Sequence, residues 1–298
     1  MTVAFARLRR LLRSVAGIAL DSDKLYLAES RLAPIMLDNG DIDLAELMRR
    51  IEHSGDEQFL QAVIDAMTTN ETSFFRDRTP FDLFRRELLP ELMERRKDKR
   101  RLRIWCAACS TGQEPYSLAM LLEEEGARLK DWTVEILATD ISATALQTAR
   151  RGVYSQFEVQ RGLSTQRLLR HFEQHDGNWR ANDRLRARVD FRALNLLTSF
   201  RHIGPFDIVF CRNVLLYLAP EIRRDVLSRL ATVTVEDGWL ILGTAEAASE
   251  GRRHFAPAST AHCWLLQRRP AAARIRAIGT AGDRSADAAA LELARPWA

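Results

Sequence analysis

Apolar side chains recur every three or four residues along the first 68 positions, a spacing typical of amphipathic helices. The spacing predicts helices over residues 24–37, 43–53 and 57–67, with turn-rich segments between them. Pro34 is expected to end or kink the first of these helices, because proline has no backbone N–H to donate. No strand-like run occurs in this part of the sequence, so residues 1–68 predict a small all-helical N-terminal domain.

Beyond residue 100 the pattern changes to short apolar runs that alternate with helical segments. The runs occupy residues 102–107, 134–140, 206–213, 238–243 and 261–268. Such alternation indicates a mostly parallel sheet with helices on both faces. We therefore predict an α/β fold with a doubly wound, Rossmann-like sheet, in which ligands bind at the carboxyl ends of the strands.

Two segments depart from this alternation. Between residues 153 and 192 polar and apolar positions alternate in a way that predicts a small antiparallel β insertion. Residues 270–298 are rich in Ala and Arg and lack a sustained apolar period, so we expect a flexible tail there. The predicted second domain accordingly spans residues 69–269.

Composition and charge narrow the classes of function. The 298 residues are 46% hydrophobic and 28% charged, as in a globular protein. The formal charge of +4 is concentrated at the ends, because the first thirteen residues carry +4 and residues 268–298 carry +3, which leaves about −3 between them. The charge therefore gives little support to nucleic-acid binding. No apolar run approaches the roughly 20 residues of a membrane span, and the basic N-terminus lacks the apolar core of a secretory signal, so a cytoplasmic location is expected.

Two groups of residues allow more than one interpretation. Residues 95–103 contain seven basic side chains, which fit a phosphate-binding patch or, as we favour, a solvated helix end. Cys106 and Cys109 form a CxxC pair, but a structural zinc site requires a second pair at similar spacing, and Cys211 and Cys263 are single. We expect small buried cysteines here rather than a metal site or a regulatory thiol.

The segment 105–117, WCAACSTGQEPYS, leads from a predicted strand through small residues into a helix start. Small residues allow a ligand to approach the backbone, but the absence of GxGxxG and GK[ST] argues against a pyrophosphate or P-loop site. Glu114, at the helix start, disfavours phosphate and favours a cationic or hydroxyl-bearing group. A ligand that carries a ribose and a sulfonium, as S-adenosylmethionine does, fits this combination.

Polar residues also end the second and fourth predicted strands. Asp140 either accepts both hydroxyls of a ribose or caps the helix that begins near Ser142, and we favour the ligand. Arg212 and Asn213 follow the fourth strand and are expected at the same edge of the sheet. Tyr217, taken alone, fits ordinary core packing.

Six segments together resemble the bacterial chemotaxis protein-glutamate O-methyltransferases: NETSFFRD (70–77), CSTGQEPYSLAM (109–120), ATDIS (138–142), ALNLL (193–197), FDIVFCRNVLLY (206–217) and GTAE (243–246). The resemblance implies a helical N-terminal domain, a doubly wound methyltransferase domain with a small β-subdomain, and S-adenosylmethionine as methyl donor, with S-adenosylhomocysteine as product. The implied acceptors are glutamate side chains on the cytoplasmic methylation helices of chemoreceptors. By this resemblance the protein meets the membrane only indirectly, through the receptor, and binds no nucleic acid.

The resemblance also implies a set of site residues. The family's cofactor contacts fall on Asn70, Thr72, Arg76, Glu114, Asp140, Asn195, Leu196, Arg212 and Asn213. Asp140 would hold the ribose, and Asn195 and Leu196 would border the adenine. Arg76 would pair with the methionine carboxylate or the incoming acid, and Tyr217 would lie close to the transferred methyl group.

We expect Arg76 and Tyr217 to be catalytic by orienting the acceptor carboxylate. A glutamate side chain with an ordinary pKa of about 4.3 is ionised at neutral pH and needs no general base. No metal is required for this chemistry, so none is predicted.

The sequence departs from the family in the parts that would meet the receptor. The family's second N-terminal helix often carries several arginines, whereas Arg31 is the only arginine within residues 31–36. We expect Arg49, Arg50 or the basic N-terminus to compensate. Some members bind a receptor pentapeptide through a Gly-Tyr-Gly loop in the β-subdomain, and its absence between residues 153 and 192 predicts docking without a tether.

Two alternatives are open on the sequence alone. The first is a methyltransferase that acts on nucleic acid or a small molecule. Amino-methylating DNA enzymes typically carry (N/D/S)PP(Y/F/W) after the fourth strand, and CRNVLLY at that place argues against them. The second is a non-catalytic regulatory scaffold that binds S-adenosylmethionine, which the presence of Arg76, Asp140, Asn213 and Tyr217 disfavours.

Overall fold

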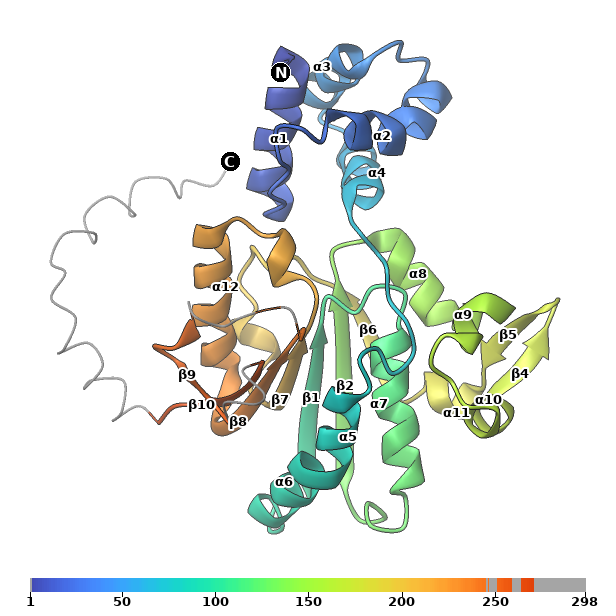
Figure 1. Cartoon of the computed structure of the whole chain (residues 1–298), viewed down its shortest axis with the longest axis vertical. Helices are drawn as coiled ribbons and strands as arrows, with labels where there is room; N and C mark the ends of the chain where they lie inside the picture. The colour runs from blue at the N-terminus through green and yellow to red at the C-terminus, as the bar shows by residue number, and fades with distance from the viewer. Residues whose placement is uncertain (1, 245, 247–250, 259–263, 271–298) are drawn as a thin grey trace, which may run out of the picture.

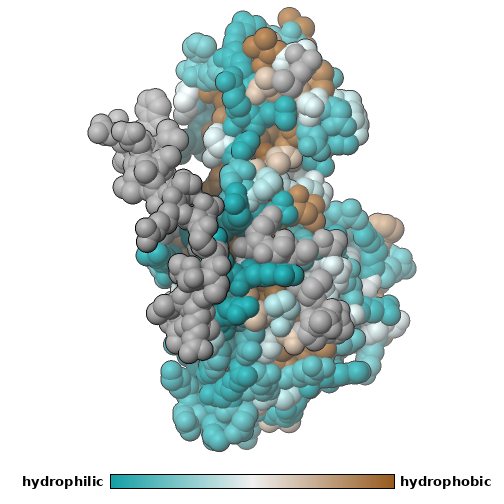
Figure 2. All heavy atoms as spheres, turned by 60° about the vertical axis from the view of Figure 1, so that its left-hand side comes forward, coloured by the Kyte–Doolittle hydropathy of each residue, from teal (hydrophilic) through white to brown (hydrophobic). Residues whose placement is uncertain are grey.

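The computed structural model describes residues 2–244, 246, 251–258 and 264–270. A small helical part lies above the upper ends of the strands of a larger, sheet-containing part (Figure 1). Each part has its own cluster of buried apolar side chains. On the face shown in Figure 2, hydrophilic atoms dominate the lower part and hydrophobic atoms gather mainly over the helical part.

Four helices form the N-terminal part: α1 (Val3–Ala16), α2 (Leu25–Asn39), α3 (Leu44–Ser54) and α4 (Glu57–Met67). Side-chain caps from Thr2, Asp43 and Asp56 start α1, α3 and α4. The predicted helical domain is confirmed. Of the two outcomes expected at Pro34, the end of the helix is wrong, because α2 continues to Asn39. Leu32 is fully buried in the turn before the proline and keeps α2 packed on the core, which offsets the one lost backbone hydrogen bond.

The main sheet has seven strands in the order β6-β2-β1-β7-β8-β10-β9. Their bounds are β1 (Arg101–Ala107), β2 (Thr133–Asp140), β6 (Val189–Ala193), β7 (Phe206–Cys211), β8 (Thr234–Leu242), β9 (Phe255–Pro257) and β10 (Leu265–Arg268). The first five in sheet order are parallel, and β10 and β9 are antiparallel to their neighbours. Because β1 lies between β2 and β7, the chain winds outward in both directions from this point. The predicted doubly wound fold is therefore confirmed.

Helices cover both faces of this sheet (Figure 1). The helices that follow the parallel strands are α7 (Gln113–Glu124), α8 (Ala143–Arg151), the short η2 (Arg201–Ile203), η3 (Leu215–Tyr217) and α12 (Pro220–Val233). The helices that precede β1 are α5 (Thr79–Leu83), the π-helical η1 (Phe84–Leu88) and α6 (Leu89–Arg95). Trp105 of β1 packs fully buried against Phe200 and Phe206, with ring centroids 5.1 and 5.4 Å away. Within the described ranges, the structure has no helix of the length and apolar character needed to cross a membrane.

The insertion is a three-stranded antiparallel sheet with short helices. It comprises β3 (Val153–Tyr154), α9 (Gln156–Gln160), α10 (Thr165–His171), β4 (Phe172–His175), β5 (Asn178–Ala181) and α11 (Asp183–Arg186). The insertion is confirmed, but the predicted range of 153–192 runs into β6, which pairs in parallel with β2 in the main sheet. As the edge strand, β6 exposes part of its length, so its sequence alternates as an antiparallel strand would.

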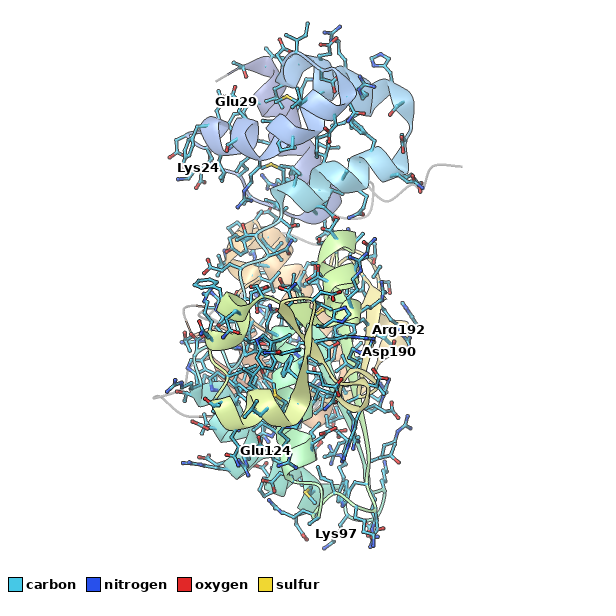
Figure 3. All side chains as sticks on the ribbon, turned by 90° about the vertical axis from the view of Figure 1, so that its right-hand side faces the viewer. Lys24, Glu29, Lys97, Glu124, Asp190 and Arg192 are labelled. Atoms are coloured by element: carbon cyan, nitrogen blue, oxygen red, sulfur yellow. The ribbon has the colours of Figure 1, made fainter. Side chains whose placement is uncertain are left out.

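Acidic neighbours compensate the basic segment 95–103. Six of its seven basic side chains contact carboxylates, chiefly those of Asp207, Asp237 and Glu135. Lys97, which pairs with Glu94, lies at the end of the molecule opposite the N-terminal helices (Figure 3). The segment is therefore a charge-compensated helix end rather than a phosphate-binding patch.

Candidate active site

A cavity of about 370 Å³ lies between the N-terminal helices and the carboxyl ends of β1, β2 and β7. Its walls come from residues 16–31, the linker 67–72 and the loop after β1, together with the ends of β2 and β7. Open α/β sheets bind ligands where the strand order reverses, which in this sheet is between β1 and β7. The cavity is therefore where the fold itself predicts a ligand.

The loop after β1 approaches the cavity with its backbone. Ala108 and Ser110 have positive φ angles of 62° and 51°, and Gly112 has a φ of 96°. A Cβ on Gly112 would lie 2.9 Å from the Cβ of Ala149, so only glycine fits there. The Ser110 hydroxyl donates to the carbonyl of Asn70 at 2.9 Å, which joins this loop to the linker.

Asp140, at the end of β2, is 6% exposed and lines the same cavity. One carboxylate oxygen accepts the N–H of Ser110 at 2.7 Å and the other accepts the N–H of Ser142 at 2.9 Å. Burial raises the pKa of Asp140, and these N–H groups partly oppose the rise. The cap of α8 is Ser142, which accepts the N–H of Ala145, so capping does not account for Asp140. Each carboxylate oxygen has acceptor capacity left for a hydroxyl donor.

Glu114 and Arg212 form a buried ion pair beside the cavity. Arg212 Nη1 donates to Glu114 Oε2 at 2.8 Å, and Nη2 donates to Asp77 Oδ2 at 2.7 Å and to the carbonyl of Arg76 at 2.9 Å. Burial raises the pKa of Glu114, whereas the charge of Arg212 opposes that rise. The charge of Glu114 is thus already balanced within the protein by Arg212. From the sequence we expected Glu114 to favour a cationic ligand, and this internal partner was not anticipated.

Arg76 and Tyr217, the two predicted catalytic residues, both line the cavity. Arg76 Nη1 donates to the carbonyl of Glu71 at 2.8 Å, and its neighbours Phe75 and Asp77 have left-handed φ angles of 50° and 66°. Tyr217 ends the short helix η3 and is 38% exposed. The structure therefore brings Arg76 and Tyr217 together around one cavity, along with Asn70, Thr72, Glu114, Asp140, Arg212 and Asn213.

Asn195 and Leu196 are not part of the cavity lining. The Asn195 side chain donates to the carbonyl of Val15 at 2.7 Å and accepts the N–H of Leu197 at 2.9 Å. Leu196 is 8% exposed and belongs to the main core. In this structure the Asn195 side chain connects the loop after β6 to the end of α1.

Glu246 supports the site but was not among the predicted site residues. Its side chain accepts the N–H groups of Gly243 at 2.7 Å, Asn213 at 2.8 Å and Leu216 at 3.2 Å. These bonds hold the turn between β7 and Tyr217. The glutamate of the GTAE segment was the available signal, although nothing in the spacing indicated what it would bind.

The N-terminal helices also contribute charged side chains that the sequence did not assign to the site. Lys24 and Arg31 line the cavity, and Figure 3 shows Lys24, which directly precedes α2. Arg31 donates to the carbonyl of Met67 at 3.0 Å and to the hydroxyl of Thr69 at 3.1 Å. Arg31 thus holds the linker between the two parts of the chain.

The three cysteines in the described part of the chain are all largely inaccessible to solvent. Cys106, Cys109 and Cys211 are buried free thiols, and burial raises the pKa of each. Cys263 lies outside the described residues. In the part of the chain that the structure describes, no group of three or more His, Cys, Asp or Glu side chains is arranged to hold a metal ion.

Comparisons with known proteins agree with this arrangement. Residues 4–68 match the family model described as "CheR methyltransferase, all-alpha domain", and residues 70–263 match "CheR methyltransferase, SAM binding domain". The chain is 44% identical over 255 residues to Chemotaxis protein methyltransferase 1 of Pseudomonas aeruginosa, covering 84% of this chain and 92% of that protein. It is 41% identical over 255 residues to Chemotaxis protein methyltransferase Cher2 of Pseudomonas putida, with the same coverage of both chains. Identity to the Chemotaxis protein methyltransferase of Vibrio parahaemolyticus is 42% over 241 residues, covering 80% and 86%.

Two adjoining family matches thus cover the helical part and the sheet-containing part, and the relatives align over most of their own length. The second match describes a domain that binds S-adenosylmethionine, and it contains most of the residues that line the cavity. The chain therefore belongs to the CheR methyltransferase family.

Proposed function

We propose that the protein transfers a methyl group from S-adenosylmethionine to glutamate side chains of methyl-accepting chemotaxis receptors, forming methyl esters. The observation that carries the proposal is the single cavity that collects Asp140, Arg76 and Tyr217. Membership of the CheR methyltransferase family supports the methyl donor. The names of the relatives support chemotaxis proteins as acceptors.

The residues present suit the donor. The two oxygens of Asp140, which already accept the N–H groups of Ser110 and Ser142, would hold the hydroxyls of the ribose, and the small residues after β1 would allow the cofactor to approach the backbone. Asn70 and Thr72 on the linker complete the wall of the cavity. Because Arg212 is paired with Glu114 and Arg31 is bound to the linker, we assign Arg76 to the methionine carboxylate or the acceptor.

The reaction requires positioning rather than proton transfer. S-adenosylmethionine supplies a methyl group made electrophilic by the sulfonium. A carboxylate oxygen of the acceptor forms its bond to the methyl carbon while the carbon–sulfur bond breaks, and no proton moves. Orienting two reactants can lower a barrier by about 7–11 kcal/mol in favourable cases. We assign that orientation to Arg76 and to the hydroxyl of Tyr217.

The proposed partner is a cytoplasmic methylation helix of a chemoreceptor, bound without a pentapeptide tether, and the proposed location is the cytoplasm. Arg31 is engaged with the linker, and Arg50 is bound to the buried carboxylate of Asp41. Arg49 and Arg10 are exposed, as Arg50 is, but they take no part in the pair with Asp41. We therefore assign contact with an acidic receptor helix to Arg10 and Arg49 rather than to Arg50.

Incubation with methyl-labelled donor and receptor methylation helices tests the proposed function. Base-labile label on the receptor is the expected result. Label on nucleic acid or a small molecule would instead support a different methyltransferase, and donor binding without any transfer would support a non-catalytic scaffold.

We predict that Arg76→Ala and Tyr217→Phe each lower the rate of methyl transfer by about 10- to 100-fold, because the acceptor is no longer held in line. Single-turnover rates with labelled donor measure the effect. Arg78→Ala and Tyr26→Phe are matched controls at exposed positions and should retain full activity. Unchanged rates in both Arg76→Ala and Tyr217→Phe would rule out the assigned roles.

A further inference from the structure

The two parts of the protein are joined by main-chain hydrogen bonds next to Tyr217. The N–H of Ala19 donates to the carbonyl of Tyr217 at 2.8 Å, and the N–H of Ala219 donates to the carbonyl of Gly17 at 3.3 Å. The two bonds flank an isolated antiparallel β-bridge. The backbone just after α1 is therefore paired with the backbone that carries Tyr217.

Gly17 permits this close approach. It ends α1 with a φ of +74°, and a Cβ at this position would lie 2.9 Å from Leu197, 3.0 Å from Leu218 and 3.2 Å from Ile222. Gly40 ends α2 with nearly the same φ, +72°, but a Cβ there would have no atom within 4 Å. The two glycines thus share a backbone conformation, but of the two Gly17 alone lies against side chains of the sheet-containing part.

The segment that carries Tyr217 is held at both of its ends. Glu246 binds the N–H groups of Asn213 and Leu216 at the beginning of the segment. The junction formed by residues 17–19 binds its end. Tyr217 itself is 38% exposed, so its place in the cavity depends on how the rest of the segment is held.

We infer that the junction of residues 17–19 positions Tyr217 for methyl transfer, so that Gly17 is a positioning residue of the enzyme. The inference rests on the proposed function, in which Tyr217 orients the acceptor. The N-terminal helices then set the geometry of the reaction in addition to forming a wall of the cavity. A displacement of about 1 Å at a reacting centre can cost about 100-fold in rate.

The test compares Gly17→Ala with Gly40→Ala. Both variants place alanine in a left-handed conformation, so the comparison isolates the contacts of Gly17. We expect Gly17→Ala to lower the single-turnover rate by about tenfold or more and Gly40→Ala to leave it within about twofold. In a Tyr217→Phe background the effect of Gly17→Ala should fall below about threefold, because the junction acts through Tyr217.

Two further measurements keep the inference testable if Gly17→Ala folds poorly or the acceptor is not the proposed one. Ala19→Pro removes the N–H that binds the Tyr217 carbonyl and should lower the rate as Gly17→Ala does. Amide hydrogen exchange over residues 213–219 should be faster in Gly17→Ala and Ala19→Pro, but not in Gly40→Ala.

Equal rates and equal exchange in the two glycine variants would overturn the inference. If the wild-type protein forms no ester on any receptor helix, the proposed function fails instead. The exchange comparison then still decides whether the junction holds the segment that carries Tyr217.

Discussion

Arg212 shows how strongly this site depends on one buried side chain. Its side chain is 2% exposed, and its guanidinium binds Glu114, Asp77 and the carbonyl of Arg76 at once. Glu114 depends on Arg212 in turn, because burial alone would leave its carboxylate without compensation. The pair therefore connects β7, the start of α7 and the turn that carries Arg76.

We predict that Arg212→Met destabilises the protein by about 3–5 kcal/mol, the cost of leaving one charge of a buried pair uncompensated. Adding Glu114→Gln should recover at least about 1 kcal/mol of this loss, because it removes the stranded charge. Urea unfolding of the two single variants and the double variant measures the coupling. Arg224→Met, at an exposed position of α12, is the control and should change stability by less than about 0.5 kcal/mol. Simple additivity of the two substitutions would contradict a coupled pair.

For single residues, the sequence predicted where a side chain lies in the fold better than it predicted which partner that side chain binds. Asp140 was predictable because it directly follows a buried strand whose carboxyl end must face the ligand edge. The partner of Glu114 could not be predicted, because Arg212 lies 98 residues away in the sequence and comes close only when β7 pairs with β1. Asn195 was assigned beside the adenine, whereas its side chain binds Val15, a contact that requires the two parts of the chain to meet.

At the scale of elements, α6 is fastened to the sheet through Arg96. Its guanidinium binds Asp207 Oδ1 at 2.7 Å and both carboxylate oxygens of Asp237 in β8, with Nη1 at 2.8 Å from Oδ2. Two-oxygen contact of this kind is the geometry in which an arginine binds a carboxylate best. The hydrogen bond from Arg96 lowers the pKa of Asp237 below its ordinary value of 3.8.

A lowered pKa in the folded state means that this pair stabilises the protein above the ordinary pKa and that the stabilisation is lost as the pH falls through the lowered value. We predict that Asp237→Asn costs about 0.5–1 kcal/mol at neutral pH, a small value because the Asp237 side chain is 44% exposed. The difference from wild type should shrink as the pH drops below 3.8. Urea unfolding across this pH range measures it, with the exposed Asp98→Asn as control. A difference that does not change with pH would contradict the pairing.

The pattern of apolar residues predicted most elements, through one apolar face in the helices and through continuous apolar runs in the central strands, and it was misled where burial is uneven. Three of the four N-terminal helices were predicted from their apolar spacing, and the central strands β1, β2 and β7 were predicted from runs that are buried on both faces. The edge strand β6 is exposed along part of its length, so its alternation suggested the antiparallel insertion. Pro34 suggested a helix end, yet packing of α2 on the core outweighed the local signal.

At the scale of the whole molecule, the two apolar cores are separate, but the cavity is shared. Residues 16–31 of the helical part and the strand ends of the sheet-containing part line it together. The sequence predicted two domains correctly in kind, but it gave no indication that the ligand site lies between them. The site lies between the two parts because the backbone of residues 17–19, just after α1, is hydrogen-bonded to residues 217–219. No local sequence pattern reveals this contact.

A ligand that contacts both parts must stabilise both. We predict that S-adenosylhomocysteine at 100 times its Kd raises the free energy of unfolding by about 2.7 kcal/mol. Amide exchange should slow in α1 and α2 as well as in the strands next to the cavity, because Ala16, Leu20 and Arg31 lie in its wall. Adenosine, which lacks the methionine part, is the matched control. It should slow amide exchange around Asp140 more than around Arg76. Protection confined to the sheet-containing part would show that the ligand site is not shared, and the N-terminal helices would then serve only to meet the receptor.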